Sequence, residues 1–302
     1  MFHSLLSKFY TNTSLSIALS LSAAAWGLYW IPLRQIEELG ITSSWTVVIF
    51  NACPLVVLCP LFLFYFKSLK GSLKPTLYAS LAIGMAFTFY ANSLVETTVI
   101  RATLLFYLTP VWSTIFGIIW LSEILTKARI VSITIAFIGL FLLLSNSNFS
   151  GYPLNIGDLF GFLSGIFWGI GATLINRWPK MPILPLATLC FIFTTIYSSI
   201  FAVFFYIDPF PYFHLIKIAM PTIAFWSILI LMPSFCIVFI VSKYLFPGRV
   251  GILMMSEVIV AIVTASILIP DEKMILLQWL GAFAIIFAGI YEVLFGYNKN
   301  NL

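Results

Sequence analysis

Charged residues are scarce in this sequence. Only 8% of its 302 residues are Asp, Glu, Lys or Arg, against about 25% in soluble domains. Hydrophobic residues make up 62%, against roughly 45–50% in soluble domains. So few polar side chains could not cover the outside of a soluble protein with this apolar content, whereas lipid removes the need for such a cover. The composition therefore excludes a soluble protein and predicts an integral membrane protein.

Cysteine and histidine are also rare. The four cysteines lie in apolar stretches without a CxxC pair, and His3 and His214 are the only histidines. Zinc, haem and disulfide frameworks therefore lack ligands, and we expect no cofactor and no metal. The 15 basic residues are scattered singly or in pairs. The net charge of +5 thus indicates membrane topology rather than nucleic-acid binding.

Long apolar runs are what the sequence does contain. A bilayer core about 30 Å thick requires about 20 apolar residues per helix. Polar and turn-forming breaks divide the chain into ten such runs, so we predict an all-α integral membrane protein with ten transmembrane helices. The expected spans are 15–34, 44–66, 76–95, 99–121, 128–145, 157–177, 184–206, 217–240, 249–269 and 275–295.

Lys and Arg are distributed unevenly between alternate loops. With the N-terminus in the cytoplasm, eleven of them fall on the cytoplasmic side and four outside: Arg34, Arg101, Lys217 and Lys273. This bias follows the positive-inside rule. We therefore expect a multi-pass protein of the cell (inner) membrane with both termini in the cytoplasm.

The two halves of the chain repeat a series of features. Trp26-Gly27 in the first span and Trp168-Gly169 in the sixth each precede an Arg by eight or nine residues. The fourth and ninth spans each run from an Arg to an acid, and Glu123 corresponds to Asp271 at an offset of 148. Two sets of five spans must be inverted, because an odd span count reverses the second half. We expect repeats at residues 1–146 and 147–302; chance similarity between apolar helices is the alternative.

These residues resemble the EamA-type members of the drug/metabolite transporter (DMT) superfamily. The Trp-Gly pairs look like that family's opening motif, and Ser256 to Glu272 is similar to its ninth-helix pattern. Leu108-Thr109-Pro110 through Leu121-Ser122-Glu123 resembles the same motif in the first repeat. Val258 stands where the family has proline after the acid, which puts the kink of the ninth helix in doubt. The resemblance implies ten helices around a central cavity and alternating access, with substrates from amino acids to nucleotide sugars.

Glu257 is the sharpest single feature. It follows Arg249 by eight residues, which places it roughly 12 Å into the hydrocarbon core. A carboxyl group at that depth costs a few kcal/mol and persists only beside a cavity or a partner. A cation-binding or proton-carrying site is one interpretation. A structural acid that is neutral or hydrogen-bonded to a neighbour is the other.

Aromatic and polar side chains on other spans are candidates for the wall of a solute cavity. Tyr and Trp combine a large face with one hydrogen-bond donor and can hold an ammonium group by cation–π contact. Packing against lipid or core is the competing interpretation. Arg101, at the start of the fourth span, could attract an anionic group, or reach the headgroups or Glu96. The predicted substrate-binding set is Glu257, Trp26, Tyr29, Trp30, Tyr90, Asn92, Tyr107, Trp168 and Arg101.

The sequence thus predicts a secondary transporter for a small polar organic solute, such as an amino acid, an amine or a related metabolite. Transport would proceed by alternating access and be proton-coupled through Glu257. A passive channel or a lipid-linked-metabolite flippase is the alternative. An intramembrane enzyme is not expected, because the spans lack a Ser–His pair, paired aspartates and HExxH. The expected partners are the solute, the bilayer and protons, with no nucleic acid, in a monomer or homodimer.

Overall fold

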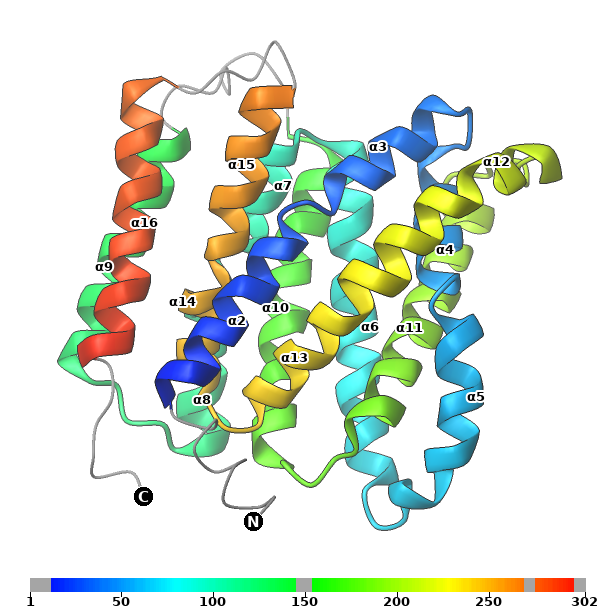
Figure 1. The fold of residues 1–302 in the computed structure, drawn as a ribbon. Helices are drawn as coiled ribbons and strands as arrows, with labels where there is room; N and C mark the ends of the chain where they lie inside the picture. Colours follow the sequence, from blue (N-terminus) through cyan, green and yellow to red (C-terminus); the bar gives the residue numbers. More distant parts are fainter. Residues whose placement is uncertain (1–11, 145–153, 269–274, 296–302) are drawn as a thin grey trace.

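The chain folds into a bundle of helices (Figure 1). The computed structural model describes residues 12–144, 154–268 and 275–295, and this part contains no strand. The first half holds α2 (Asn12–Trp26), α3 (Trp30–Glu38), α4 (Ser43–Ala52), α5 (Leu55–Tyr65), η1 (Phe66–Leu69), α6 (Leu73–Glu96), α7 (Val99–Phe106), α8 (Thr109–Leu121) and α9 (Lys127–Leu144).

The second half continues with the same kind of element. It holds α10 (Ile156–Arg177), α11 (Ile183–Ile200), η3 (Phe201–Phe205), α12 (Phe213–Ala224), η4 (Phe225–Leu231), α13 (Met232–Ser242), α14 (Pro247–Met254), α15 (Ser256–Leu268) and α16 (Leu276–Phe295). Several predicted spans are therefore built from two or three successive helical pieces.

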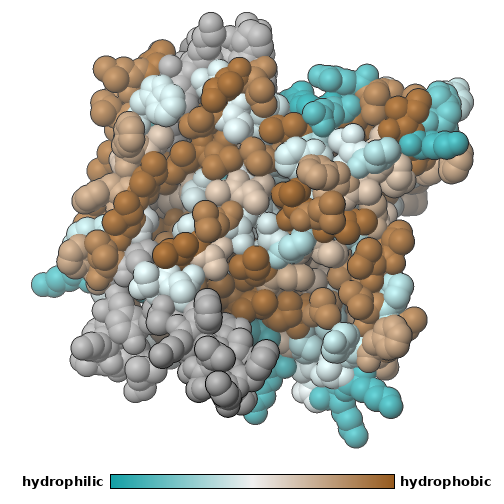
Figure 2. Space-filling model, viewed as in Figure 1, coloured by the Kyte–Doolittle hydropathy of each residue, from teal (hydrophilic) through white to brown (hydrophobic). Residues whose placement is uncertain are grey.

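Six helical stretches of the described residues are long and apolar enough to cross a membrane. They are Thr13–Glu38, Leu73–Glu96, Ile156–Arg177, Ile183–Phe205, Phe213–Ser242 and Pro247–Leu268. The pair formed by α4 and α5 passes the test as one span bent by 42°, and Thr109–Leu121 and Leu276–Tyr291 are shorter apolar helices. Brown hydrophobic side chains cover much of the face in Figure 2, with hydrophilic ones gathered at its upper right and lower edges. These features are those of a multi-pass α-helical membrane protein.

Most turns of the described chain gather at two ends of the bundle. The end at which α2 begins also holds the turns at 66–72, 122–126, 178–182 and 243–246, at the bottom of Figure 1. We call this the lower end and the opposite one the upper end. In the same view α9 and α16 lie side by side at one edge, and Gly139 of α9 packs directly against the backbone of Gly281 in α16.

The structure corrects three sequence-based expectations. The eighth helical stretch begins at Phe213 rather than near residue 217, so Lys217 lies within α12. Asp158 lies one residue inside the predicted span 157–177, and we expected it to belong to the preceding loop; it lies in the first turn of α10, where it forms a capping box with Asn155. We expected all four cysteines to be buried as small apolar side chains, because they lie in apolar stretches, but Cys59 is exposed on α5. The Pro270 to Glu272 end of the ninth-helix motif lies outside the described residues.

Candidate functional site

Three helical stretches of the described chain are interrupted within the bundle. Residues 27–29 separate α2 from α3, Tyr107 and Leu108 separate α7 from α8, and Met255 separates α14 from α15. Pro110 lacks an amide hydrogen, which accounts for the break before α8. The ninth stretch is interrupted without a proline, at the single turn residue Met255, one turn ahead of Val258.

Glu257 lies directly after one of these breaks, in the first turn of α15. Its side chain is only 2% exposed. The Tyr90 hydroxyl donates to Oε1 at 2.8 Å, and the Tyr107 hydroxyl lies 2.6 Å from Oε2. Both carboxyl oxygens are therefore held by tyrosines from other helices, as a buried acid requires. The predicted neighbours Tyr90, Tyr107 and Glu257 are brought together.

Aromatic rings enclose the rest of the carboxyl group. Trp26 stacks on Phe87 with centroids 5.3 Å apart, and Phe87 lies 5.6 Å from the ring of Trp168. The cavity between these rings has a volume of about 10 Å³, which is room for about one water molecule. Its lining is Trp26, Phe87, Tyr90, Phe106, Trp168, Phe235, Val238, Met254 and Glu257. The structure is therefore closed around the acid, and a larger solute requires the rings to separate.

Of the other predicted site residues, Tyr29, Trp30 and Asn92 do not line this cavity. Tyr29 accepts a hydrogen bond from Asn51 at 3.4 Å and packs edge-on against Trp26. The Trp30 indole donates to the Thr264 hydroxyl at 3.2 Å, which ties α3 to α15. Asn92 is buried in α6, where its amide donates to the carbonyl of Thr88. The side chain of Arg101 lies outside the described part of the structure.

Four aromatic or sulfur-containing residues of the lining were not among the site residues predicted from the sequence. Phe87, Phe106, Phe235 and Met254 are among 30 phenylalanines and eight methionines, so composition gave no means of selecting them. Phe87 lies three residues before Tyr90, and therefore on the same face of α6. That spacing was the one signal that could have identified it.

Close glycine contacts hold the helices around the cavity. A Cβ atom at Gly27 would lie 2.5 Å from the backbone oxygen of Glu257 and 2.9 Å from the amide of Ala261. A Cβ atom at Gly169 would lie 3.2 Å from the amide of Ser113 in α8. Both Trp-Gly pairs thus combine a tryptophan at the cavity with a glycine that admits a neighbouring helix. Ala261 and Thr264 lie on the same face of α15 as Glu257. Ala261 packs against Gly27, and Thr264 accepts a hydrogen bond from Trp30, so this face packs against the first helical stretch.

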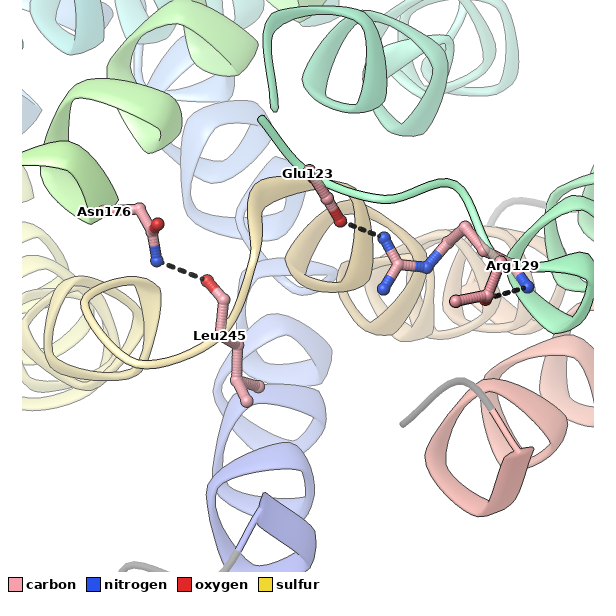
Figure 3. Close-up of polar contacts among 5 residues, drawn as sticks. Glu123, Arg129, Asn176 and Leu245 are labelled. Atoms are coloured by element: carbon pink, nitrogen blue, oxygen red, sulfur yellow. Dashed lines mark hydrogen bonds and ion pairs between the residues drawn. The ribbon is translucent and has the colours of Figure 1, made fainter. Parts of the chain in front are cut away.

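Polar contacts close the bundle at its lower end. Asn176 of α10 donates to the carbonyls of Leu245 at 3.0 Å and Ser242 at 3.2 Å, and so holds the turn between α13 and α14 (Figure 3). The Lys243 ammonium donates to the carbonyl of Met181. Burial lowers the pKa of Lys243 from its ordinary value.

A buried ion pair lies at the same end. Glu123 and Arg129 face each other across the turn between α8 and α9 (Figure 3). A Cβ atom at Gly248 would come within 2.7 Å of Arg129 Nη1, so the start of α14 rests on the pair. These contacts join the helices and turns to one another at the lower end.

A wider groove lies apart from the acid, between α2, α14, α15 and α16. Its volume is about 370 Å³, and its lining is apolar apart from a few hydroxyls, among them Ser16, Ser20 and Ser256. Glu257 does not line this groove, so we do not assign the site there. Within the described residues, no three His, Cys, Asp or Glu side chains are placed to hold a metal ion.

The fold and the enclosed acid define a multi-pass helical membrane protein with an internal aromatic cavity. Residues 13–145 match the EamA-like transporter family, which is part of the DMT superfamily, so the resemblance seen in the sequence is confirmed. By this segment, which is less than half of the 302 residues, the chain is similar to a family of membrane transporters.

Solved structures share the fold. Among 19 matching chains, one described only as a crystal structure of a protein covers 94% of this chain and 97% of its own length. The TM-score is 0.70 at 14% sequence identity, a likeness that concerns the fold alone. No curated protein matches the sequence.

Proposed function

We propose that the protein is a secondary transporter for a small polar organic solute that carries an ammonium group, such as an amino acid or an amine. The observation that carries this proposal is Glu257, buried among aromatic rings between the helices of an EamA-like bundle. A carboxyl group supplies a counter-charge, and Trp26 and Trp168 supply ring faces that attract a cation. No described residue of the cavity lining is basic, which favours a cationic group over an anionic one.

Protons are the coupling ion in this proposal. A buried carboxyl group binds either a proton or the solute's ammonium group, because both occupy the same oxygens. Exchange of one for the other at Glu257 would link solute movement to a proton gradient. Trp26, Tyr90, Tyr107 and Trp168 form the remaining contacts of the proposed site, and Tyr29 supports Trp26 by an edge-on ring contact. Trp30 and Asn92 stay proposed members of the site, although they do not line the closed cavity. Arg101 keeps its proposed role toward a substrate carboxylate.

The proposed architecture is ten transmembrane helices in two inverted repeats, residues 1–146 and 147–302. Paired contacts support it. Gly27 packs on Ala261 and Gly169 packs on Ser113, and residues 113 and 261 differ by the offset of 148 that relates Glu123 to Asp271. The same offset relates the break at Tyr107 to the break at Met255. The late glycines of the fifth and tenth spans, Gly139 and Gly289, do not make equivalent contacts. A Cβ atom at Gly139 would lie 2.7 Å from the backbone oxygen of Gly281, whereas one at Gly289 would have no described atom within 4 Å.

We further propose the inner membrane as the location, with the lower end and both termini in the cytoplasm. Basic residues of the described chain gather in and beside the lower turns: Lys67, Lys70, Lys74, Lys127, Arg129, Arg177, Lys180, Lys243 and Arg249. The bias favours this orientation. Arg249 lies within α14 rather than in the loop, and donates to Ser16 at 3.1 Å.

Alternating access is the proposed mode of transport. The cavity is too small for a solute, and hydrogen-bonded contacts close the bundle at the lower end, so passage requires rearrangement. A carrier that opens to one side at a time fits this arrangement better than a passive channel, which needs a continuous pore. A flippase for lipid-linked metabolites remains the other candidate, and saturable exchange of a water-soluble amine distinguishes the two.

Uptake into proteoliposomes tests the proposal. Amines and amino acids that raise the melting temperature of the purified protein are tested for saturable counterflow and for accumulation driven by a pH gradient. In the Glu257→Gln variant we expect pH-driven accumulation to be lost and affinity to fall at least about tenfold, or about 1.4 kcal/mol. Glu38→Gln, an exposed carboxylate on α3, is the matched control and retains both activities. Unchanged rate and pH dependence in Glu257→Gln would show that the assigned role is wrong.

A further inference from the structure

The Tyr107 hydroxyl has two acceptors and one proton. It lies 2.6 Å from Glu257 Oε2 and 2.9 Å from the backbone carbonyl of Met254. A phenol has a single hydrogen and therefore donates to one of these oxygens at a time. The hydroxyl of Tyr90, the other tyrosine at the acid, donates to Oε1 of the same carboxyl group.

The second acceptor belongs to the break in the ninth helical stretch. In an unbroken helix the Met254 carbonyl would accept from the amide of Val258. Here the Val258 amide bonds the carbonyl of Met255 at 3.1 Å, and the Tyr107 hydroxyl reaches Met254 instead. The side chain of Tyr107 thus supports the break between α14 and α15. A buried carbonyl that lost this donor would cost about 1–3 kcal/mol.

The protonation state of Glu257 decides where the hydroxyl hydrogen goes. When Glu257 is protonated, its own hydrogen points to the Tyr107 oxygen and Tyr107 donates to Met254, so every close contact contains one hydrogen. When Glu257 is ionised, the charge-assisted bond from Tyr107 to Oε2 is the stronger one. The Met254 carbonyl then loses its donor. No atoms are gained beyond the proton that Glu257 binds or releases.

We propose that Tyr107 is a positioning residue that transmits the protonation state of Glu257 to the break between α14 and α15. The proposal rests on the proton-carrying role proposed for Glu257. Protonation holds the break in the closed arrangement, and loss of the proton releases it, which frees α14 to move relative to α15. The Tyr107 hydroxyl thereby couples solute binding at Glu257 to movement of the ninth helical stretch.

Few other groups near the acid titrate. Tyr90 on α6, Tyr107 between α7 and α8, and Tyr29 between α2 and α3 are the titratable neighbours, and tyrosine ordinarily titrates near 10. From α10 and α13 the cavity presents Trp168, Phe235 and Val238, which do not titrate. Among the described groups of the cavity, Glu257 is therefore the one that can change its charge well below the range in which tyrosine titrates.

Hydrogen exchange of the purified protein without any solute tests the inference. Mass spectrometry follows the amides of residues 252–260, with rates corrected for the pH dependence of chemical exchange. In the wild type we expect severalfold faster corrected exchange around Met255 at pH 8.5 than at pH 6. Tyr107→Phe should exchange fast at both values. Tyr197→Phe, the same change on α11 outside the cavity lining, is the matched control and should keep the pH dependence.

Glu257→Gln provides a second variant with the opposite expectation. Its amide donates to Tyr107 at every pH, so the break should stay protected at both values. A wild type without pH dependence, or a Tyr107→Phe variant that keeps it, would overturn the inference. Since no solute is present, this outcome is separate from failure of the transport assay: a protein that carries no amine can still show the switch, and a carrier can lack it.

Discussion

Glu123 and Arg129 form an ion pair whose two side chains are both buried, at 7% and 5% exposure. Loss of one partner from a buried pair leaves an uncompensated charge, which costs about 3–5 kcal/mol. We therefore expect Glu123→Gln and Arg129→Gln each to lower the free energy of unfolding by about this amount. The double variant should lose less than the two single losses together, because it leaves no unpaired charge.

The wild type, the two single variants and the double variant form a double-mutant cycle. Their free energies of unfolding are measured by circular dichroism in mixed detergent micelles. Lys127→Gln removes an exposed cation from the first turn of the same helix, α9, and serves as the control. We expect it to change the free energy of unfolding by less than about 0.5 kcal/mol. Additive losses in the double variant would mean that the pair makes no energetic contribution as a pair.

The acid of the site could be predicted from the sequence, whereas much of its surroundings could not. Glu257 is the one acid in an apolar run of the sequence. Because burying a carboxyl group in a membrane is costly, the sequence alone identifies it as a candidate site residue. Trp26 and Trp168 were marked by their repeated glycine neighbours. Phe87 and Met254 carry no such mark, because their roles depend on which helices meet. Tyr29 and Trp30 share a face with Trp26, yet the interruption of the helix at residues 27–29 directs them to other partners.

At the scale of helices, the close approach of α2 and α15 depends on Gly27. A Cβ atom there would lie 2.5 Å from the backbone carbonyl oxygen of Glu257 and 2.7 Å from the Cβ atom of Val260. Overpacking of this kind costs typically about 1–3 kcal/mol. We expect Gly27→Ala to lower the melting temperature in detergent, and to reduce transport because it displaces the first turn of α15.

Gly289→Ala is the matched control for this substitution. Gly289 lies in α16, and no neighbouring atom of the described residues lies within 4 Å of the point that a Cβ atom would occupy. Alanine in an open helical position favours the helix by up to about 1 kcal/mol. The melting temperature should therefore stay the same or rise. A fall as large as that of Gly27→Ala would show that helix contact at Gly27 is not the cause.

Helix positions were easier to predict from the sequence than helix interruptions. Apolar runs of span length located the helical stretches to within a few residues, since hydrocarbon thickness fixes their length. Pro54 and Pro110 lie at two interruptions, because proline removes a helix hydrogen bond, whereas Pro60 lies inside α5 without interrupting it. The break at Met255 has no proline. Its support comes from Tyr107, 148 residues away in the chain, and such a contact cannot be read from local sequence.

At the scale of the whole molecule, the two ends of the bundle are closed by different contacts. Asn176 holds the turn between α13 and α14 at the lower end. The bond from Trp30 to Thr264 joins α3 to α15 on the upper side of the cavity. If the protein opens to one side at a time, weakening one set of contacts should favour opening at that end alone.

A cysteine at Val238, which lines the cavity, reports such opening when the four natural cysteines are replaced. A membrane-impermeant thiol reagent is added to vesicles of either orientation. We expect Asn176→Leu to speed labelling from the lower side and Thr264→Val to speed labelling from the upper side. Lys180→Gln, an exposed lower-end control, should leave both rates unchanged. Faster labelling from both sides at once in either variant would indicate a pore, because a carrier that opens one end keeps the other closed.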